Sequence, residues 1–193
     1  MKYIHYSKEP IEKLETKSYE NFVNLLKPRG LWFSVENTGY KDDISWKQWC
    51  EETEFELERL KYSHEIEFKD SANLLFISNK KQMIEFNRNW SKTPSLLKGI
   101  NEKYLEPSKD LIKPLFDLFV KKHSDEKISF EEYKELSSIY NIPDWENIAK
   151  EYDGIIIAPY QQSWRLIFSW YHGLDCASGC IWNLDSIKEF KLI

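Results

Sequence analysis

The chain has 193 residues, of which 41% are apolar and 31% charged, a composition typical of one globular domain large enough to bury a core. Its formal net charge is −5, from 27 basic and 32 acidic residues. These values exclude a fibrous or disordered chain and argue against a sequence-independent DNA-binding protein, although they do not exclude a local basic groove.

The first residues of the chain, its apolar stretches and its cysteines indicate the cellular compartment. The first residues, MKYIHYSKEP, lack the apolar run of a secretory signal, and no stretch reaches the roughly 18 uncharged apolar residues of a membrane helix. We therefore expect a cytoplasmic protein that does not contact a membrane. Cys50, Cys176 and Cys180 are an odd number, and their spacing matches neither a thioredoxin motif nor a zinc knuckle. We expect reduced thiols.

The first half of the chain alternates between predicted strands and helices. Ser18 and Ser45 precede the first two helices as N-caps. The expected elements are a strand at 2–6, a helix at 18–27, a strand at 30–36, a helix at 45–60, strands at 62–69 and 72–78, and a helix at about 80–90.

The second half begins with a long helical pattern. Residues from about 95 to 151 are helical in periodicity, and prolines lie near the expected starts and breaks, so we predict a helical insertion at about 92–151 within a single domain. Within it, Ser129 and Glu132 form a capping box. The remaining predicted elements are strands at 152–160 and 179–184 and a short terminal helix, DSIKEF, at 185–190.

The strand at 30–36 has two different faces. Alternation puts Leu31 and Phe33 on one face and Trp32 and Ser34 on the other. The first pair is typical of a core. The second pair combines a flat aromatic with a small hydroxyl, which suits either core packing or stacking on a planar ligand.

Several well-known motifs are absent from the sequence. It contains no G-x-G-x-x-G, G-x-x-x-x-G-K-[ST], G-x-S-x-G or H-E-x-x-H motif, and the four histidines are scattered. We therefore expect neither a glycine-rich phosphate loop nor a metal site.

Two short motifs resemble a known superfamily. IHYS at 4–7 and GLWFS at 30–34, followed by a turn and a helix near Ser45, are similar to the front half of ADP-ribosyltransferases of the His-Tyr-Glu type. That group includes diphtheria-type toxins, poly(ADP-ribose) polymerases and, more distantly, RNA 2′-phosphotransferases. YDGIII at 152–157 and NLDSI at 183–187 resemble its closing strands and terminal turn. These motifs cover about 35 of the 193 residues, and their order and spacing carry the resemblance.

The resemblance implies a fold, a cofactor and a set of roles. The fold would be α+β, with a split mixed β-sheet, flanking helices and a helical insertion. The cofactor would be NAD, bound by His5, Tyr6, Ser7, Trp32 and Ser34. His5 would also be catalytic, fixing the ribose, and Trp32 would take the place of the family's stacking Tyr. Tyr6 replaces a Gly whose backbone approaches the nicotinamide in the family.

The third catalytic residue departs from the family pattern. The family's Glu would begin the last strand near Ser178 or Gly179, and neither residue can act as a carboxylate. Asp175 is the nearest acidic candidate. Two interpretations stay open: Asp175 supplies the catalytic carboxylate, or it caps a turn by accepting backbone N–H groups.

The aromatic segment before the last strand is where transferases of this type recognise their target. By that resemblance Tyr160, Gln162, Trp164 and Arg165 would bind a macromolecular acceptor, either a protein or a nucleic acid. The alternative is that WRLIFSWYHG is a short amphipathic helix packed on the core. The expected function is an NAD-dependent mono-ADP-ribosyltransferase. The other hypotheses are a non-catalytic binding module on a degenerate transferase fold and an NAD glycohydrolase.

Overall fold

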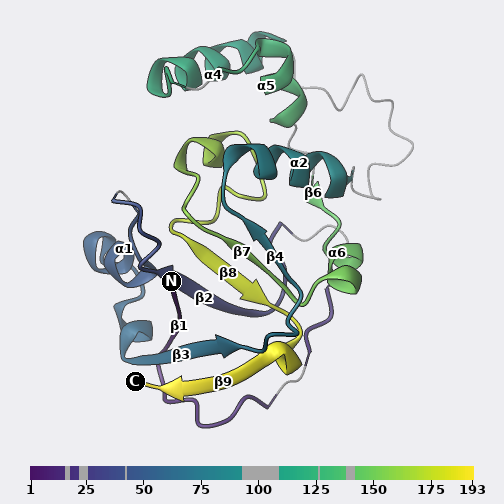
Figure 1. Ribbon diagram of the computed structural model, residues 1–193. Helices are drawn as coiled ribbons and strands as arrows, with labels where there is room; N and C mark the ends of the chain where they lie inside the picture. Colours follow the sequence, from purple (N-terminus) through teal and green to yellow (C-terminus); the bar gives the residue numbers. More distant parts are fainter. Residues whose placement is uncertain (16–17, 22–25, 42, 93–108, 126, 138–141) are drawn as a thin grey trace.

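The computed structural model describes the chain except for residues 16–17, 22–25, 42, 93–108, 126 and 138–141. A seven-stranded mixed β-sheet with strand order β4-β7-β8-β2-β1-β3-β9 forms its centre (Figure 1). β4 and β7 are parallel and all other neighbours are antiparallel. The strands are β1 Lys2–Ser7, β2 Leu31–Glu36, β3 Tyr62–Phe68, β4 Leu74–Ile77, β7 Gly154–Ile157, β8 Ser178–Ile181 and β9 Ile187–Leu192.

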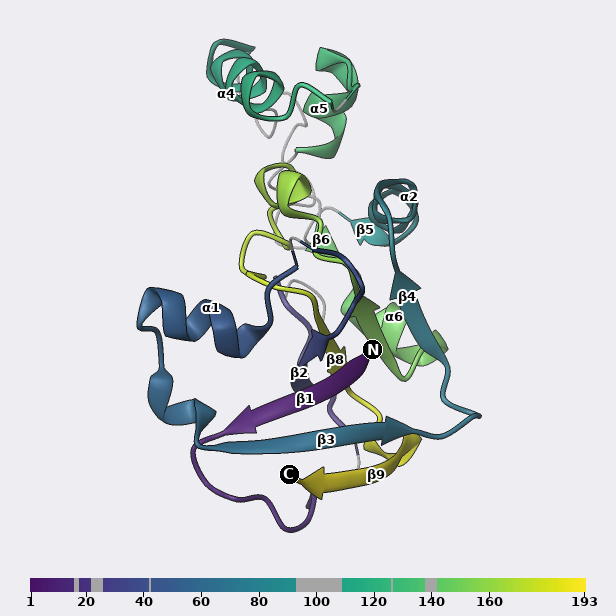
Figure 2. The same cartoon turned by 60° about the vertical axis from the view of Figure 1, so that its left-hand side comes forward.

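Helices flank this sheet, so the fold class is α+β, as predicted. The pair α4 and α5 lies at the end of the molecule away from β1, β3 and β9 (Figures 1 and 2). The α-helices are α1 Trp46–Thr53, α2 Lys80–Trp90, α4 Lys109–Lys122, α5 Phe130–Leu136 and α6 Trp145–Glu151. The 3₁₀-helices are η1 Leu57–Leu60, η3 Gln162–Leu166 and η4 Leu184–Ser186, and the short strands β5 Ser91–Lys92 and β6 Ile142–Pro143 pair with each other.

The predicted helix at 45–60 is interrupted. Ser45 caps α1 by accepting the Gln48 N–H at 3.1 Å, as expected, but the helix ends at Thr53. Glu54 and Glu56 both adopt left-handed backbone conformations, with φ of 55° and 42°. A continuous helix would stack the glutamates of this segment at i, i+4 spacing, which like charges disfavour.

Two other predicted helices are wrong where the structure describes them. In the segment 18–27, residues 18–21 and 26–27 are not helical, and residues 22–25 lie outside the described residues. The Tyr19 N–H instead donates to the Trp182 carbonyl at 2.7 Å. In place of the predicted terminal helix at 185–190, residues 185–186 belong to a 3₁₀-helix and Ile187–Leu192 form β9. The strand adds to the otherwise open edge of β3, with Phe190 opposite Ile66.

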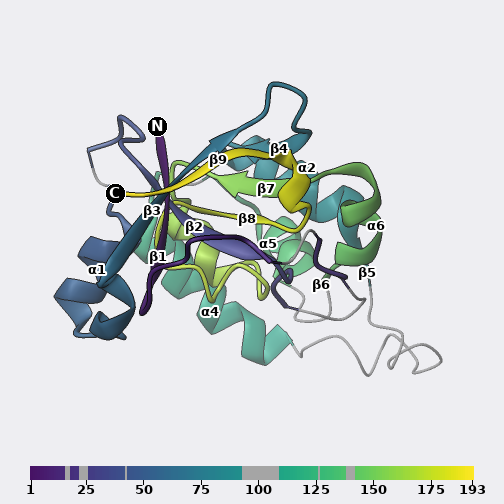
Figure 3. The ribbon, with the colours of Figure 1, turned by 90° about the horizontal axis from the view of Figure 1, so that it is seen from below.

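Hydrophobic cores lie on both faces of β7. Ile155 and Ile157 belong to a core that α2, α5, α6 and the segment around η3 cover, while Ile156 belongs to a second core. The second core contains Phe33 from β2 and Ile66 from β3, so it fills the space between the two halves of the bent sheet. Figure 3 shows β1 and β3 running at a steep angle to β7 and β8.

The two halves of the sheet are joined narrowly. β1 and β2 pair only from Lys2 opposite Glu36 to Ile4 opposite Ser34. Beyond that point β1 continues along β3, whereas β2 continues along β8. The sheet therefore opens between β1 and β2, which creates room for side chains. No helix in the described part of the chain combines the length and apolar character that a membrane crossing requires.

Candidate functional site

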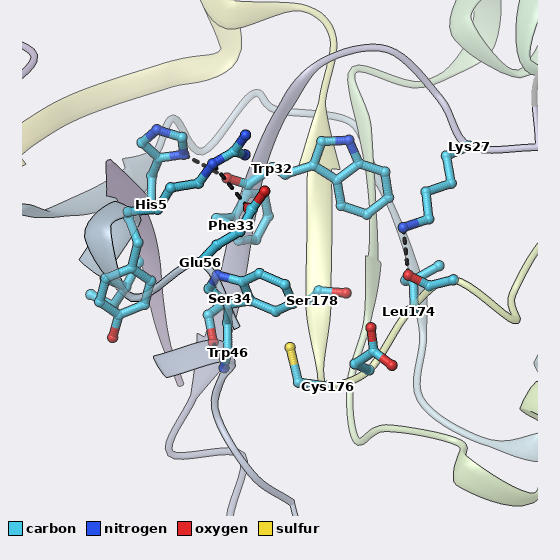
Figure 4. A pocket seen from close by; sticks show the side chains of 15 residues that line it. His5, Lys27, Trp32, Phe33, Ser34, Trp46, Glu56, Leu174, Cys176 and Ser178 are labelled. Atoms are coloured by element: carbon cyan, nitrogen blue, oxygen red, sulfur yellow. Dashed lines mark hydrogen bonds and ion pairs between the residues drawn. The ribbon is translucent and has the colours of Figure 1, made fainter. Parts of the chain in front are cut away.

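A cavity of about 300 Å³ lies where β1 and β2 separate, and we call it the β1–β2 cavity (Figure 4). Its walls come from β1, β2, the first residue of α1, the segment 56–59 and the segment 173–178. Five predicted site residues line it together, although they are far apart in the sequence: His5, Tyr6, Trp32, Ser34 and Asp175.

His5 bridges the opening between the two strands. Its Nδ1 lies 2.7 Å from the Trp32 carbonyl oxygen, which can only accept, so Nδ1 carries the proton and donates. Nε2 is left as an acceptor, and no described residue hydrogen-bonds to it. Burial lowers the pKa of His5, and the bond to Trp32 offsets part of that effect. His5 is therefore a neutral imidazole whose orientation the backbone of β2 fixes.

A second histidine, His64, lies next to His5 on β3. It is buried, its Nε2 accepts the Ile11 N–H at 3.0 Å, and its ring stacks on Phe190 with centroids 4.9 Å apart. Burial lowers the pKa of His64 as well. The sequence did not single out this neighbour, but His5 and His64 face each other in the β1–β3 register.

Trp32 forms a half-buried wall of the cavity. Its ring packs against the first core, which is the first alternative left open by the sequence, and it also lines the β1–β2 cavity. The Lys27 ammonium lies 5.6 Å from the ring centroid and donates to the Gly173 carbonyl. Burial lowers the pKa of Lys27, and Asp175 opposes this shift. Lys27 was not predicted to belong to the site, because the sequence placed it at the end of the expected helix at 18–27 and outside the strand motif.

Three predicted hydroxyl groups are occupied within the protein. The Tyr6 hydroxyl donates to Glu36, and burial together with this carboxylate raises the pKa of Tyr6 strongly. The buried Ser34 hydroxyl accepts the Trp46 N–H at 3.0 Å and so anchors the start of α1. Ser7 does not line the cavity, and its hydroxyl donates to the Glu9 carbonyl at 2.6 Å.

Asp175 lies in the cavity wall just before β8. Its side chain is 13% exposed, and its Oδ1 lies 2.7 Å from Nη2 of Arg165 in an ion pair that lacks the alignment of a hydrogen bond. No described backbone N–H donates to this carboxylate, so the turn-capping alternative has no contact in its favour. Asp175 is a charged group held at the cavity by Arg165.

The first two positions of β8 carry no carboxylate and differ in the room that they leave for a side chain. A Cβ at Gly179 would lie 2.2 Å from Cζ of Phe33, so this position admits no side chain. Ser178 lines the cavity, and it is the only one of the two positions from which a side chain can face a ligand. The cavity therefore lacks a carboxylate on β8 itself.

The predicted acceptor segment is largely core. Trp164 is fully buried, which leaves it no surface for an acceptor, and the Tyr160 hydroxyl donates to the Leu174 carbonyl at 2.6 Å. Burial raises the pKa of Tyr160 to about 12. Arg165 donates from Nε to the His172 carbonyl at 2.8 Å, and of the four predicted acceptor residues only Gln162 is exposed. This agrees with the alternative that the segment packs on the core, although it forms the short η3 rather than a longer amphipathic helix.

Several cavity residues were not predicted. Trp46, Glu56 and Arg59 line the cavity, and Arg59 Nε lies 2.9 Å from Glu56 Oε2. A continuous helix at 45–60 would have separated these side chains, which is why sequence periodicity did not group them. Cys176 also lines the cavity, and its burial raises the pKa of the thiol strongly, so it is protonated and a poor nucleophile.

All three cysteines are buried free thiols. Within the described ranges no group of three or more His, Cys, Asp or Glu side chains is placed to hold a metal ion. Comparisons with protein-family models, with curated proteins and with solved structures give no significant match.

Proposed function

We propose that the protein is an NAD-dependent mono-ADP-ribosyltransferase that modifies a macromolecular acceptor, on a split-sheet fold of the ADP-ribosyltransferase type. One observation carries the proposal: the opening between β1 and β2 gathers His5, Trp32 and Asp175 around a single cavity. These residues come from three separate segments, and the sequence resemblance had assigned them to one site from their positions in its motifs. The narrow β1–β2 joint agrees with the split sheet that the resemblance implies.

The cavity suits the nicotinamide and ribose end of NAD. Its mixed lining offers the flat ring of Trp32, the imidazole of His5 and the carboxylate of Asp175 within about 300 Å³. NAD supplies an activated bond between nicotinamide and ribose, whose cleavage develops positive charge on the sugar.

Each residue has a role that its contacts support. Nε2 of His5 accepts a hydrogen bond from a ribose hydroxyl, because Nδ1 is already committed to Trp32. The Trp32 ring holds a planar base by stacking. The Asp175 carboxylate stabilises positive charge on the sugar, and Arg165 fixes its position.

A second hypothesis has a specific observation in its favour. No carboxylate lies on β8, and Arg165 neutralises part of the Asp175 charge. A non-catalytic module that binds NAD or a related nucleotide would have these features.

Incubation with NAD labelled separately in the nicotinamide and in the adenylate tests these functions. Transferase activity predicts release of nicotinamide together with adenylate label on protein or nucleic acid. Release without label transfer would indicate a glycohydrolase, and binding without release would indicate the non-catalytic module. His5→Ala should abolish the reaction, and His123→Ala, at the end of α4 outside the cavity, is the matched control.

A further inference from the structure

Three aromatic side chains beside the cavity form a surface that belongs to neither core. Trp46 and Trp49 of α1 stack with centroids 5.1 Å apart, and Phe55 packs edge-on against both, at 6.0 Å and 5.4 Å. We call these three residues the aromatic platform. Neither hydrophobic core of the described structure includes them, and neither has Trp46 or Trp49 among the partly buried side chains packed against it.

The platform is open to solvent. Phe55 is 43% exposed, and Trp46 and Trp49 are only partly buried. Leu57, which is 48% exposed, continues the same stretch of chain. Large exposed aromatic groups that do not stabilise a core are typical of interaction sites.

The backbone holds Phe55 in place at an energetic cost. Glu54 and Glu56, on either side of it, both have positive φ angles, a conformation that costs a non-glycine residue about 1–2 kcal/mol. The Phe55 N–H donates to the Cys50 carbonyl at 3.0 Å, which turns the chain back toward the tryptophans.

The charge around the platform is negative. Residues 45–60 contain five glutamates against one lysine and one arginine. Ion pairs engage Glu51, Glu56 and Glu58. No ion pair of the described structure includes Glu52 or Glu54, and both are exposed. A nucleic acid would bring its phosphates against these carboxylates, whereas a cationic side chain would meet both attractive charge and aromatic faces.

We propose that the aromatic platform, with Glu52 and Glu54, binds an arginine-rich segment of a protein partner. A guanidinium stacks on aromatic rings and pairs with carboxylates at the same time, which an ammonium does less well. Trp46 is shared between the platform and the β1–β2 cavity, so a bound segment lies at the cavity mouth. Resting on the proposed transferase, this assigns acceptor recognition to α1 and the segment 54–57 and makes the acceptor a protein.

Binding of synthetic peptides tests the proposal directly. A fluorescent peptide of alternating Arg and Gly is titrated with the protein, beside versions in which Lys or Glu replaces Arg, and beside a single-stranded oligonucleotide. The Arg peptide should bind most tightly and the Glu peptide least. Trp49→Ala and Phe55→Ala should each weaken binding about threefold or more, since neither residue lines the cavity and a cation–π contact has this size.

Variants that remove the negative charges, and leave the aromatic rings in place, test the proposal even if an aromatic variant fails to fold. Glu52→Gln combined with Glu54→Asn keeps the aromatic rings, and Asn tolerates the left-handed backbone at position 54. This double variant should also weaken the Arg peptide, whereas Glu131→Gln combined with Glu189→Gln, at exposed positions on α5 and β9, should not. Thermal melts establish that each variant is folded.

The outcomes separate this inference from the proposed function. Unchanged Arg-peptide affinity in both kinds of variant, or tighter binding of the oligonucleotide, would overturn the platform. An NAD titration of the same proteins reports on the cavity independently. Peptide binding without NAD binding would contradict the proposed transferase and support the platform. NAD binding without peptide binding would support the transferase and contradict the platform.

Discussion

Two aromatic segments, 30–36 and 159–174, were both predicted to bind a ligand, and the structure shows that their side chains are buried to different extents. In β2 the rings alternate: Phe33 is buried in a core and Trp32 is half-buried, and both border the cavity. In the segment 159–174, Trp164 and Tyr171 are both fully buried. Aromatic content alone therefore does not mark a binding surface. What distinguishes the segments is that residues 31–33 of β2 have no paired strand on the β1 side, which leaves room beside them. The segment 159–174 instead folds over the sheet and has to cover it.

The largest difference between the segments should appear in stability. Trp164→Ala should lower the free energy of unfolding by about 3–5 kcal/mol, because it empties a fully buried site. Trp32→Ala should cost less than half of that, because one side of its ring faces the cavity. Denaturant titrations of both variants measure the difference. Leu166→Ala, 46% exposed on the same η3, is the control and should change stability by no more than about 0.5 kcal/mol. Equal losses for Trp32 and Trp164 would remove the distinction.

The parts of the fold predicted from sequence were those with local signals. Alternation in β2 correctly assigned Leu31 and Phe33 to the core, and Ser45 and Ser129 cap their helices as predicted. The interruption after Thr53 could not be predicted from periodicity, because the apolar spacing of α1 continues past it. The strand β9 was also missed, because its structure depends on the free edge of β3, which is distant in sequence.

The candidate site divides in the same way. The resemblance grouped His5, Tyr6, Trp32 and Ser34 with Ser7, and the first four line one cavity whereas Ser7 does not. The fate of the Ser34 hydroxyl could not be predicted, since its partner is the backbone of another element. The burial of Trp164 and the approach of Arg165 to Asp175 are likewise tertiary facts, because a 3₁₀-helix brings them together without any repeating pattern.

The next largest expected effect is that of a variant at Asp175. This residue lies in the segment before β8, whereas His5 and Trp32 lie on strands. Asp175→Asn should leave stability intact and lower nicotinamide release about 10²-fold if the carboxylate stabilises the transition state. Asp185→Asn, at an exposed position on η4, serves as the matched control.

Unchanged turnover in the Asp175 variant would transfer the role to another carboxylate. Glu36 accepts the Tyr6 hydroxyl, and Asp153 accepts the Asn73 N–H, so both are engaged elsewhere. Glu56 lines the cavity and would be the next candidate. Rate measurements on Glu56→Gln would then decide the assignment.

A smaller effect should separate stacking from size at Trp32. Trp32→Tyr keeps an aromatic face and should bind NAD within about threefold of the wild-type affinity, whereas Trp32→Ala should weaken it about tenfold, as expected for one stacking contact. Titration of the three proteins with NAD gives the comparison. If Trp32→Ala binds NAD with wild-type affinity, the ring does not contribute to NAD binding. The stacking role assigned to Trp32 would then be wrong.

The smallest expected effect concerns the two neutral histidines that join β1 to β3. Burial lowers the pKa values of both His5 and His64. The unfolded chain, in which a histidine titrates near about 6.5, therefore binds more protons than the folded chain just below that pH, and the free energy of unfolding falls as the pH drops from about 6.5 toward 5. Carboxylates titrate mainly below this window, so it reports on the histidines. His64→Gln retains an acceptor for the Ile11 N–H but cannot titrate. Denaturant titrations of this variant across the window should therefore show a shallower pH dependence of the free energy of unfolding than wild type. His123→Gln is the control and should leave that dependence unchanged. The same slope in His64→Gln and wild type would mean that the buried ring of His64 does not control the acid response of the fold.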